Sequence, residues 1–315
     1  MNELTQKLSD QGPRLMRASF RWRDLGDSRW LGYWMVTPAV LALAGLILAP
    51  LLYSTVLSTY SWTLLEIRLP KPFVGLMQYS TVAHDPLFGE ALKTTGLFVV
   101  GTVSVELVLG FLIALALLNI HRGRRLANGV ILLPMIVTPV IVALIWRYLL
   151  DPQFGLVNYA IHLLGYQQDI PWLGSNSLAL PSLIVIDIWE WTPFAILVLH
   201  AGMLAIPDDL YEAARVDGAG AWQIARHVIL PYLSPLILVV LLLRTMDTYR
   251  VFDTIFVLTR GGPGTSTQTV GIYAYENGFV YLNMGYTMAL SVVILIAIVV
   301  ISLFYLRLLQ RRPQW

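Results

Sequence analysis

Charged residues inside otherwise apolar stretches are the positions in this sequence best suited to do chemistry. Asp187 and Glu190 stand three residues apart in the apolar run 182–204, with Trp189 and Trp191 beside them. Carboxylates accept hydrogen bonds from hydroxyl groups and aromatic rings cover apolar C–H faces, so this cluster suits a path for a carbohydrate. The alternative is structural, because either carboxylate could cap a neighbouring backbone or pair with an arginine of another helix.

A second set of charges follows a later apolar run. Arg244, Asp247, Arg250 and Asp253 recur at every third residue with alternating sign. Residues three apart on a helix are neighbours, so opposite charges can pair along its surface. We expect Arg244 and Asp247 to neutralise one another in this way. Arg250 and Asp253 lie nearer the end of the run, next to Tyr249, and could face a translocation path.

The remaining polar residues of the apolar runs suggest no further chemistry. Glu106 is the one charged residue in the run 95–118, and we expect it to contact another helix rather than a solute. The sequence has no cysteine, His-Glu-x-x-His or Gly-x-Ser-x-Gly, which disfavours an intramembrane enzyme. The histidines lack the paired spacing of metal ligands, so no metal site is predicted. They are His84, His121, His162, His200 and His227.

The segment between the two charged runs reads as a helical hairpin. Pro207 and the acidic residues after it suit the first turn of a helix. Gly218 or Gly220 would end that helix in a left-handed conformation. A second short helix is predicted over 221–229, stopped by Pro231. From geometry alone, the hairpin would rest on a membrane surface.

The composition explains why these charges are unusual. The 315 residues are 57% hydrophobic and 13% charged, whereas a soluble domain carries about 25% charged residues. This balance excludes a water-soluble globular protein, a disordered chain and a nucleic-acid binder with a basic face. The absence of cysteine excludes disulfide frameworks, thiolate metal sites and cysteine nucleophiles. The sequence therefore predicts an integral membrane protein.

Six apolar runs are long enough to cross a bilayer as helices. A span needs about 20 apolar residues, and a β-barrel would instead show short alternating segments. A long polar lead precedes the first run, which we therefore interpret as an uncleaved span rather than a signal peptide. The predicted fold is an all-α membrane domain over residues 31–315, preceded by a tail at 1–30. The predicted spans are 33–53, 95–118, 127–146, 182–204, 234–258 and 286–306.

The distribution of lysine and arginine predicts the orientation of the spans. Fourteen of the 21 lie in the two tails and in the loops after the second and fourth spans, against three in the opposite loops. Positive charge accumulates on the cytoplasmic side. Both termini are therefore predicted to be cytoplasmic, and the hairpin lies on the same side.

The hairpin resembles the EAA loop of ABC-importer permeases. That loop reads Glu-Ala-Ala, three residues, Gly, nine residues, then Ile-x-Leu-Pro. Here Glu212-Ala213-Ala214, Gly218 and Leu230-Pro231 fall in register, with Val228 where isoleucine is usual. The resemblance implies a type I ABC-importer permease fold with a coupling loop at 205–233.

Two further stretches resemble the first permease of carbohydrate importers. They are 251–267, which contains Gly261-Gly262-Pro263-Gly264, and Phe73-Val74-Gly75-Leu76 before Tyr79. Around residues 244–259, the sequence most resembles that of disaccharide permeases of the trehalose and maltose type. The resemblance therefore implies import of a sugar, and it does not name which one.

The resemblance also implies partners and a mechanism. It implies a second permease subunit, an ABC ATPase dimer, an extracytoplasmic solute-binding protein and a bacterial or archaeal cytoplasmic membrane. ATP and Mg would bind the ATPase, because this chain has no Gly-x4-Gly-Lys-Ser/Thr and requires no cofactor of its own. The coupling residues would contact the ATPase groove. A self-sufficient ion-coupled transporter or channel, with the charges of the fourth and fifth spans as a relay, is the alternative.

Overall fold

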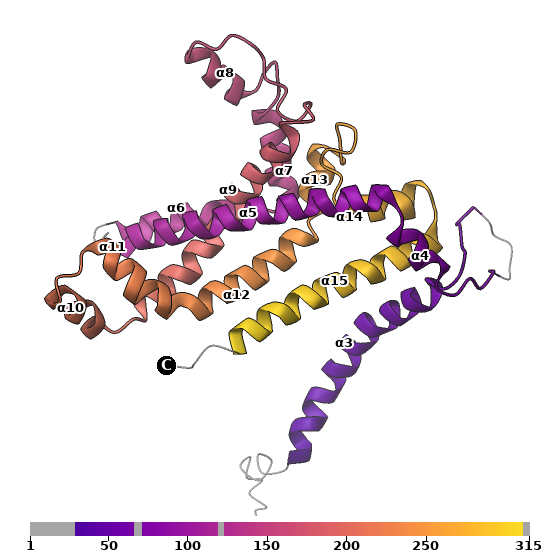
Figure 1. Cartoon of the computed structure of the whole chain (residues 1–315), viewed down its shortest axis with the longest axis horizontal. Coiled ribbons are helices and arrows are strands. Elements are labelled where there is room, and N and C mark those ends of the chain that lie inside the picture. The colour runs from indigo at the N-terminus through magenta and orange to yellow at the C-terminus, as the bar shows by residue number, and fades with distance from the viewer. Residues whose placement is uncertain (1–28, 66–70, 119–122, 311–315) are drawn as a thin grey trace, which may run out of the picture. The chain divides into compact units, whose positions relative to one another are not determined.

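The computed structural model describes residues 29–65, 71–118 and 123–310. Most of the predicted tail lies outside these residues. The chain divides into two compact units, Met1–Tyr53 and Ser54–Trp315. Figure 1 shows the described residues as helices joined by loops.

The first unit consists, in its described part, of most of one long helix. This helix, α3 (Arg29–Leu57), reaches just past the unit boundary and contains Pro38 and Pro50. Prolines are tolerated in membrane helices. Its apolar side chains are exposed along its length, as expected of a helix that contacts lipid. The first predicted span, 33–53, lies within it.

Four more helices are long and apolar enough to cross a membrane. They are α5 (Pro86–Leu118), α9 (Ala179–Leu204), α12 (Leu230–Tyr249) and α15 (Met284–Gln310). Together with α3 they make five spans. A bent pair of helices, described next, makes a sixth if the pair is counted as one span, so the described residues supply up to six spans. The predicted all-α membrane fold is therefore confirmed.

The third predicted span is broken into two helices. α6 (Arg124–Ile136) and α7 (Pro139–Leu149) meet at an angle of 99°. Thr138, directly before Pro139, is extended, with φ −67° and ψ 143°. A proline sterically disfavours helical geometry in the residue before it. The predicted third span, 127–146, therefore corresponds to a bent pair of helices.

The fifth predicted span, 234–258, differs at both ends. Helix α11 (Ala221–Ile224) continues through the π-helical turn η1 (Ala225–Ile229) directly into α12. At the other end α12 stops at Tyr249, and a short helix, α13 (Asp253–Leu258), follows a non-helical break. The helix that leaves the hairpin is therefore continuous from the hairpin to Tyr249.

The connecting segments contain short elements. A single antiparallel bridge, between Tyr60 and Phe73, is the one isolated β pairing in the described ranges. The short elements are α4 (Met77–Ala83), α8 (Leu156–Leu163), α10 (Asp208–Val216), α14 (Val270–Tyr275) and the π-helical turn η2 (Glu276–Val280).

The core of the second unit is built around α5, which packs against α9 and α12. A Cβ atom on Gly110 of α5 would lie 2.6 Å from the Cβ of Ala195 on α9. Only glycine permits so close an approach of the two backbones. Phe98 of α5 and Leu183 of α9 are fully buried in the same apolar core. This packing fixes the depth at which the charged residues of the three helices meet.

A hydrogen-bond cluster ties the start of α5 to α14 and α15. The hydroxyl groups of Tyr273 and Tyr286 both donate to Oδ2 of Asp85. The Leu87 N–H donates to its Oδ1 over 2.9 Å. Burial alone would raise the pKa of Asp85, but these hydrogen bonds outweigh it and lower the pKa below its ordinary value. Asp85 is therefore an anion that holds three chain segments together.

Candidate functional site

The predicted hairpin is present, and Gly218 ends its first helix. Gly218 has φ +77°, a left-handed conformation that favours glycine. Its N–H donates to Arg215 O over 3.0 Å, and the Ala219 N–H donates to Ala214 O over 2.9 Å. These two bonds form a Schellman motif, which satisfies the last carbonyl groups of α10. The prediction that a glycine stops this helix is confirmed at Gly218 and not at Gly220, whose φ is −73°.

The second half of the hairpin differs from the prediction, because Pro231 does not stop a helix. Gln223 Oε1 accepts a hydrogen bond of 2.7 Å from the Gly220 N–H and so caps α11. The Leu230 N–H donates to Ala225 O, five residues earlier, and Pro231 lies in the first turn of α12. A π-helical turn is one place where a helix absorbs an irregularity such as a missing donor. The expected stop at Pro231 is therefore wrong.

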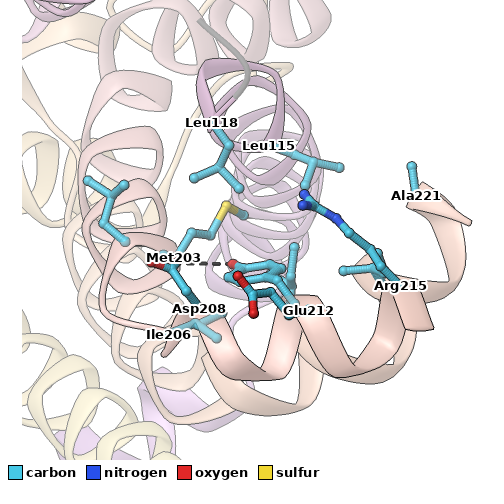
Figure 2. Close-up of a pocket in the computed structure, with 12 residues that line it drawn as sticks. Leu115, Leu118, Met203, Ile206, Asp208, Glu212, Arg215 and Ala221 are labelled. Atoms are coloured by element: carbon cyan, nitrogen blue, oxygen red, sulfur yellow. Dashed lines mark hydrogen bonds between the residues drawn. The ribbon is translucent and has the colours of Figure 1, made fainter. Parts of the chain in front are cut away.

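The hairpin borders an open hollow of about 500 Å³ against the ends of α5 and α9. Apolar residues such as Leu115 and Met203 line its floor, whereas Asp208, Glu212 and Arg215 of α10 bring charge to its rim. Figure 2 shows the Arg215 side chain extending from α10 toward Leu115. A concave surface with an apolar floor and a charged rim is suited to binding another chain or ligand.

Tyr211 fastens α10 to the end of α9 at this hollow. Its hydroxyl donates to Met203 O over 3.2 Å. Burial, with a smaller effect of Asp208, raises the pKa of Tyr211, so it stays a neutral donor. The predicted coupling residues Glu212, Ala213 and Gly218 are exposed, whereas Ala214 is half-buried. The hairpin thus presents its Glu-Ala-Ala stretch outward from a fixed position.

The second candidate region is a fully buried cluster of charges between α5, α9 and α12. Arg244 Nε donates to Glu106 Oε2 over 2.8 Å, and its Nη2 donates to Glu106 Oε1 over 2.8 Å and to Asp187 Oδ2 over 2.7 Å. The three side chains are at most 4% exposed. Bidentate, charge-assisted pairing of this kind offsets the high cost of burying the charges.

Glu190 lies next to this cluster but does not join it. It is 1% exposed, and neither carboxylate oxygen has a hydrogen-bond partner in the described part of the chain. The Trp191 ring centroid lies 4.8 Å from the Arg244 guanidinium carbon. Trp189 is 43% exposed and packs edge-on against Trp146 at 5.6 Å. The acidic and aromatic residues of α9 therefore divide between a buried face and an exposed face.

The charges beyond Arg244 lie at the end of α12. Arg250 Nη2 donates to Asp247 Oδ1 over 2.6 Å; the Arg250 side chain is largely exposed and Asp247 is half-buried. Asp253 is exposed at the start of α13. Tyr249 is buried, and its hydroxyl has no partner among the residues that the structure describes.

A family model decides the identity of this fold. The model described as "Binding-protein-dependent transport system inner membrane component" matches residues 106–314. The chain belongs to this family. It is a multi-pass membrane permease, and the matched range includes the hairpin and the buried charge cluster.

Relatives of this permease cover nearly its whole length. It is 36% identical over 277 residues to the trehalose/maltose transport system permease protein of Thermococcus litoralis, over 86% of this chain and 90% of that one. It is 35% identical over 289 residues to the trehalose transport system permease protein of Mycobacterium tuberculosis, over 89% of each. The relative from Agrobacterium fabrum, 33% identical over 93% of this chain, is a sulfoquinovosyl glycerol transport system permease protein.

A solved structure supports the same fold. The permease matches a chain of a bacterial ABC transporter that imports the acidic polysaccharide alginate, with a TM-score of 0.79 and 25% sequence identity. The match covers 93% of this chain and 99% of that chain. The type I importer permease fold implied by the hairpin motif is therefore confirmed.

The structure corrects one pairing within the permease and confirms another. Arg244 was expected to pair with Asp247, and this is wrong: it turns into the bundle and binds Glu106 and Asp187. The expectation that Glu106 contacts another helix is confirmed. The structural alternative for Asp187, a bond to an arginine of the fifth span, is also what the structure has. Sequence reasoning missed that both carboxylates share one arginine.

The roles predicted for the other residues stay predictions. Of the expected substrate path, Trp189, Arg250 and Asp253 are exposed, whereas Asp187, Glu190 and Tyr249 are buried in this conformation. Sequence reasoning also missed the charged rim of the hollow, Asp208 and Arg215. Their spacing from Glu212 along one helix could have indicated it, since residues three and four apart share a face.

Proposed function

We propose that this permease imports a sugar, with a disaccharide such as trehalose or maltose or a related carbohydrate as its substrate. The observation that carries the proposal is the 36% identity to the trehalose/maltose permease protein over nearly the whole of both chains. The likeness to the alginate importer supports a carbohydrate in general. The membrane would be the cytoplasmic membrane of a bacterium or archaeon, with both termini on the cytoplasmic side.

Transport would be driven by ATP hydrolysed on a partner ATPase dimer, which also holds the Mg. The exposed residues Glu212 and Ala213 and the hollow beside them support this assignment, because they offer a surface for a second protein. Glu212 would make a polar contact with the ATPase, and Ala213 and Gly218 would permit close packing. Leu230 and Pro231, at the start of α12, would pass the movement on to the bundle.

Two further partners complete the proposed importer. An extracytoplasmic solute-binding protein would deliver the sugar, as the family description indicates. A second permease subunit would close the translocation path. Within this chain, Trp189, Arg250 and Asp253 offer exposed aromatic and charged groups to a passing carbohydrate. Asp187, Glu190 and Tyr249 would reach it only after the helices move.

Uptake into proteoliposomes tests the proposed function. The chain is reconstituted with its second permease and ATPase, and uptake of radiolabelled trehalose and maltose is measured with the binding protein outside and ATP inside. We expect uptake that needs ATP and every partner. Sugar accumulation by this chain alone, driven by an ion gradient, would instead establish the secondary-transporter alternative.

A matched pair of glycine variants tests the coupling surface. Gly218 and Gly165 both have positive φ, +77° and +97°, and a Cβ on either would meet nothing within 4 Å. Both Gly218→Arg and Gly165→Arg therefore add the same strain and bulk, but only the first alters the hairpin. We expect Gly218→Arg to lower binding-protein-stimulated ATPase activity at least tenfold and Gly165→Arg to leave it near wild type. Equal activity of the two variants would contradict the coupling role.

A further inference from the structure

The buried charges of the permease are unevenly matched. Arg244 makes three hydrogen bonds to Glu106 and Asp187, whereas both oxygens of Glu190 lack a partner among the described residues. Glu190 is as deeply buried as its neighbours, at 1% exposed. Burying a carboxyl group without a partner is costly. Stability of the observed conformation therefore does not explain a glutamate at this position.

The geometry of α9 places Glu190 where it could replace Asp187. Residues three apart lie on one helix face and differ by about 4.5 Å along the axis. Glu190 is the one nearer the hairpin, because α9 leads into α10. Trp191 covers the guanidinium group of Arg244 at 4.8 Å, so this stretch of α9 already adjoins the arginine. The helix thus offers Arg244 two acceptors, one occupied and one vacant.

We propose that Glu190 is the second acceptor for Arg244, and that the arginine exchanges Asp187 for Glu190 when α12 moves toward the hairpin. The exchange breaks one hydrogen bond, from Nη2 to Asp187, while α5 and α9 stay packed at Gly110 and Ala195. The two bonds to Glu106 are then kept by rotation of the flexible Arg244 side chain. The guanidinium stays paired in both positions. A buried arginine with two alternative acceptors gives α12 two discrete positions relative to α9. Shifts of one helix past another occur between discrete positions of this kind.

A continuous helix connects the hairpin to this exchange. Residues 221–249 run through α11, η1 and α12 without a break, so a displacement of the hairpin reaches Arg244. The π-helical turn η1 contains one residue more than an α-helical turn would. Its conversion into an α-helical turn would rotate and shift the residues of α12 that follow it. The inference rests on the proposed coupling of this hairpin to an ATPase.

Distance measurements between spin labels test the exchange in the whole importer. The chain has no cysteine, so within it labels attach only at Val185→Cys of α9 and Val239→Cys of α12, both exposed. Any cysteines of the partner subunits are replaced by serine. Distances are recorded without nucleotide and with ATP and vanadate. The variants are Glu190→Gln, Glu190→Asp and, as a control, Glu90→Gln, whose exposed carboxylate pairs with Lys93 at 3.7 Å.

We expect a nucleotide-dependent change of distance in the wild type and in Glu90→Gln. Glu190→Gln is expected to keep the nucleotide-free distance, lose the change and lower sugar uptake at least tenfold, whereas Glu190→Asp keeps part of both. A Glu190→Gln variant that matches the wild type in the trapped state would overturn the exchange while leaving the proposed function intact. A wild type without any nucleotide-dependent change of this distance would overturn the exchange, whereas a wild type without ATP-dependent sugar uptake would overturn the proposed function.

Discussion

The hairpin and the buried charge cluster hold their residues in opposite ways. The hairpin is exposed, and its defining bonds join residues three to five positions apart, such as the Gly220 N–H with Gln223 and the Ala219 N–H with Ala214. The charge cluster is buried, and Arg244 lies 138 residues from Glu106 and 57 from Asp187. One is built by local sequence, the other by the packing of three helices.

This difference indicates which property a variant of each region should change. A hairpin held by local bonds can be altered without unfolding the bundle, so its variants should affect coupling. A buried arginine shared by two carboxylates cannot lose its charge without leaving anions unpaired in the membrane interior. Variants of the cluster should therefore affect the stability of the whole permease.

The largest effect is expected for Arg244→Met. Removing one partner of a buried ion pair costs about 3–5 kcal/mol, here because Glu106 and Asp187 lose their shared donor. We expect a strongly lowered midpoint of thermal unfolding in detergent, measured by size-exclusion chromatography after heating. A midpoint within a degree or two of the wild type would show that the cluster contributes little and would remove the contrast with the hairpin.

The matching control is a triple variant that removes all three charges. Glu106→Leu, Asp187→Leu and Arg244→Met together replace the three ions with apolar side chains, and such replacement of a buried ion cluster is often near neutral. We expect the triple variant to recover most of the stability that Arg244→Met loses. Uptake should stay low in both, since the arginine is absent.

The same difference explains what could be predicted from the sequence. The spans could be predicted because each is one continuous run of apolar residues. The hairpin could be predicted because Pro207, the acidic first turn and Gly218 act on the helix in which they stand. The bend at Thr138 was also encoded locally, by Pro139, but hydrophobicity along 127–146 obscured it. The continuation through Pro231 depended on a π-helical turn that no residue pattern indicated.

The pairing of Arg244 could not be predicted, because spacing along one helix favoured Asp247. Which residues of α5 and α9 face each other depends on packing between the helices, such as the approach of Gly110 to Ala195. That approach sets the depth at which Glu106 and Asp187 stand opposite each other. A single sequence gives the charges and their helices, but not the rotation of each helix about its axis.

An intermediate effect is expected for Asp85→Asn. Like Arg244, Asp85 joins segments that are distant in the sequence, but it lies outside the spans. The variant loses a charge-assisted acceptor for Tyr273 and Tyr286, which is worth about 1–3 kcal/mol. Because the folded-state pKa of Asp85 is lowered, its stabilisation is complete above the ordinary aspartate pKa.

The pH dependence of that variant supplies its control. The stability difference between wild type and Asp85→Asn should be constant from pH 5 to pH 8 and should shrink only below about pH 4. Thermal unfolding midpoints across this range measure it. A difference that grows as the pH falls would contradict the assignment of Asp85 as the acceptor anion.

A smaller, local effect is expected for Gln223→Ala in the hairpin. The variant removes the hydrogen bond that caps α11, worth about 1 kcal/mol. We expect an unchanged unfolding midpoint for the bundle but faster proteolysis within the hairpin and weaker stimulation of the ATPase. If the midpoint instead falls as far as in Asp85→Asn, the hairpin and the bundle unfold together, and the contrast between local and long-range assembly fails.

The smallest effect is expected for Arg250→Gln, and it sharpens the comparison most directly. Arg244 lies on α12 and Arg250 directly follows its last residue, and each binds an acidic residue within 2.8 Å. The Arg250 side chain is 67% exposed, however, and the Arg244 side chain only 3%. An exposed pair contributes at most about 1 kcal/mol, since water solvates either charge when the other is lost. We therefore expect no measurable shift of the unfolding midpoint, but a lower apparent affinity for sugar in uptake assays if Arg250 lines the path. A stability loss comparable to that of Arg244→Met would mean that a partner subunit buries Arg250 in the assembled importer, and exposure in the single chain would no longer separate the two arginines.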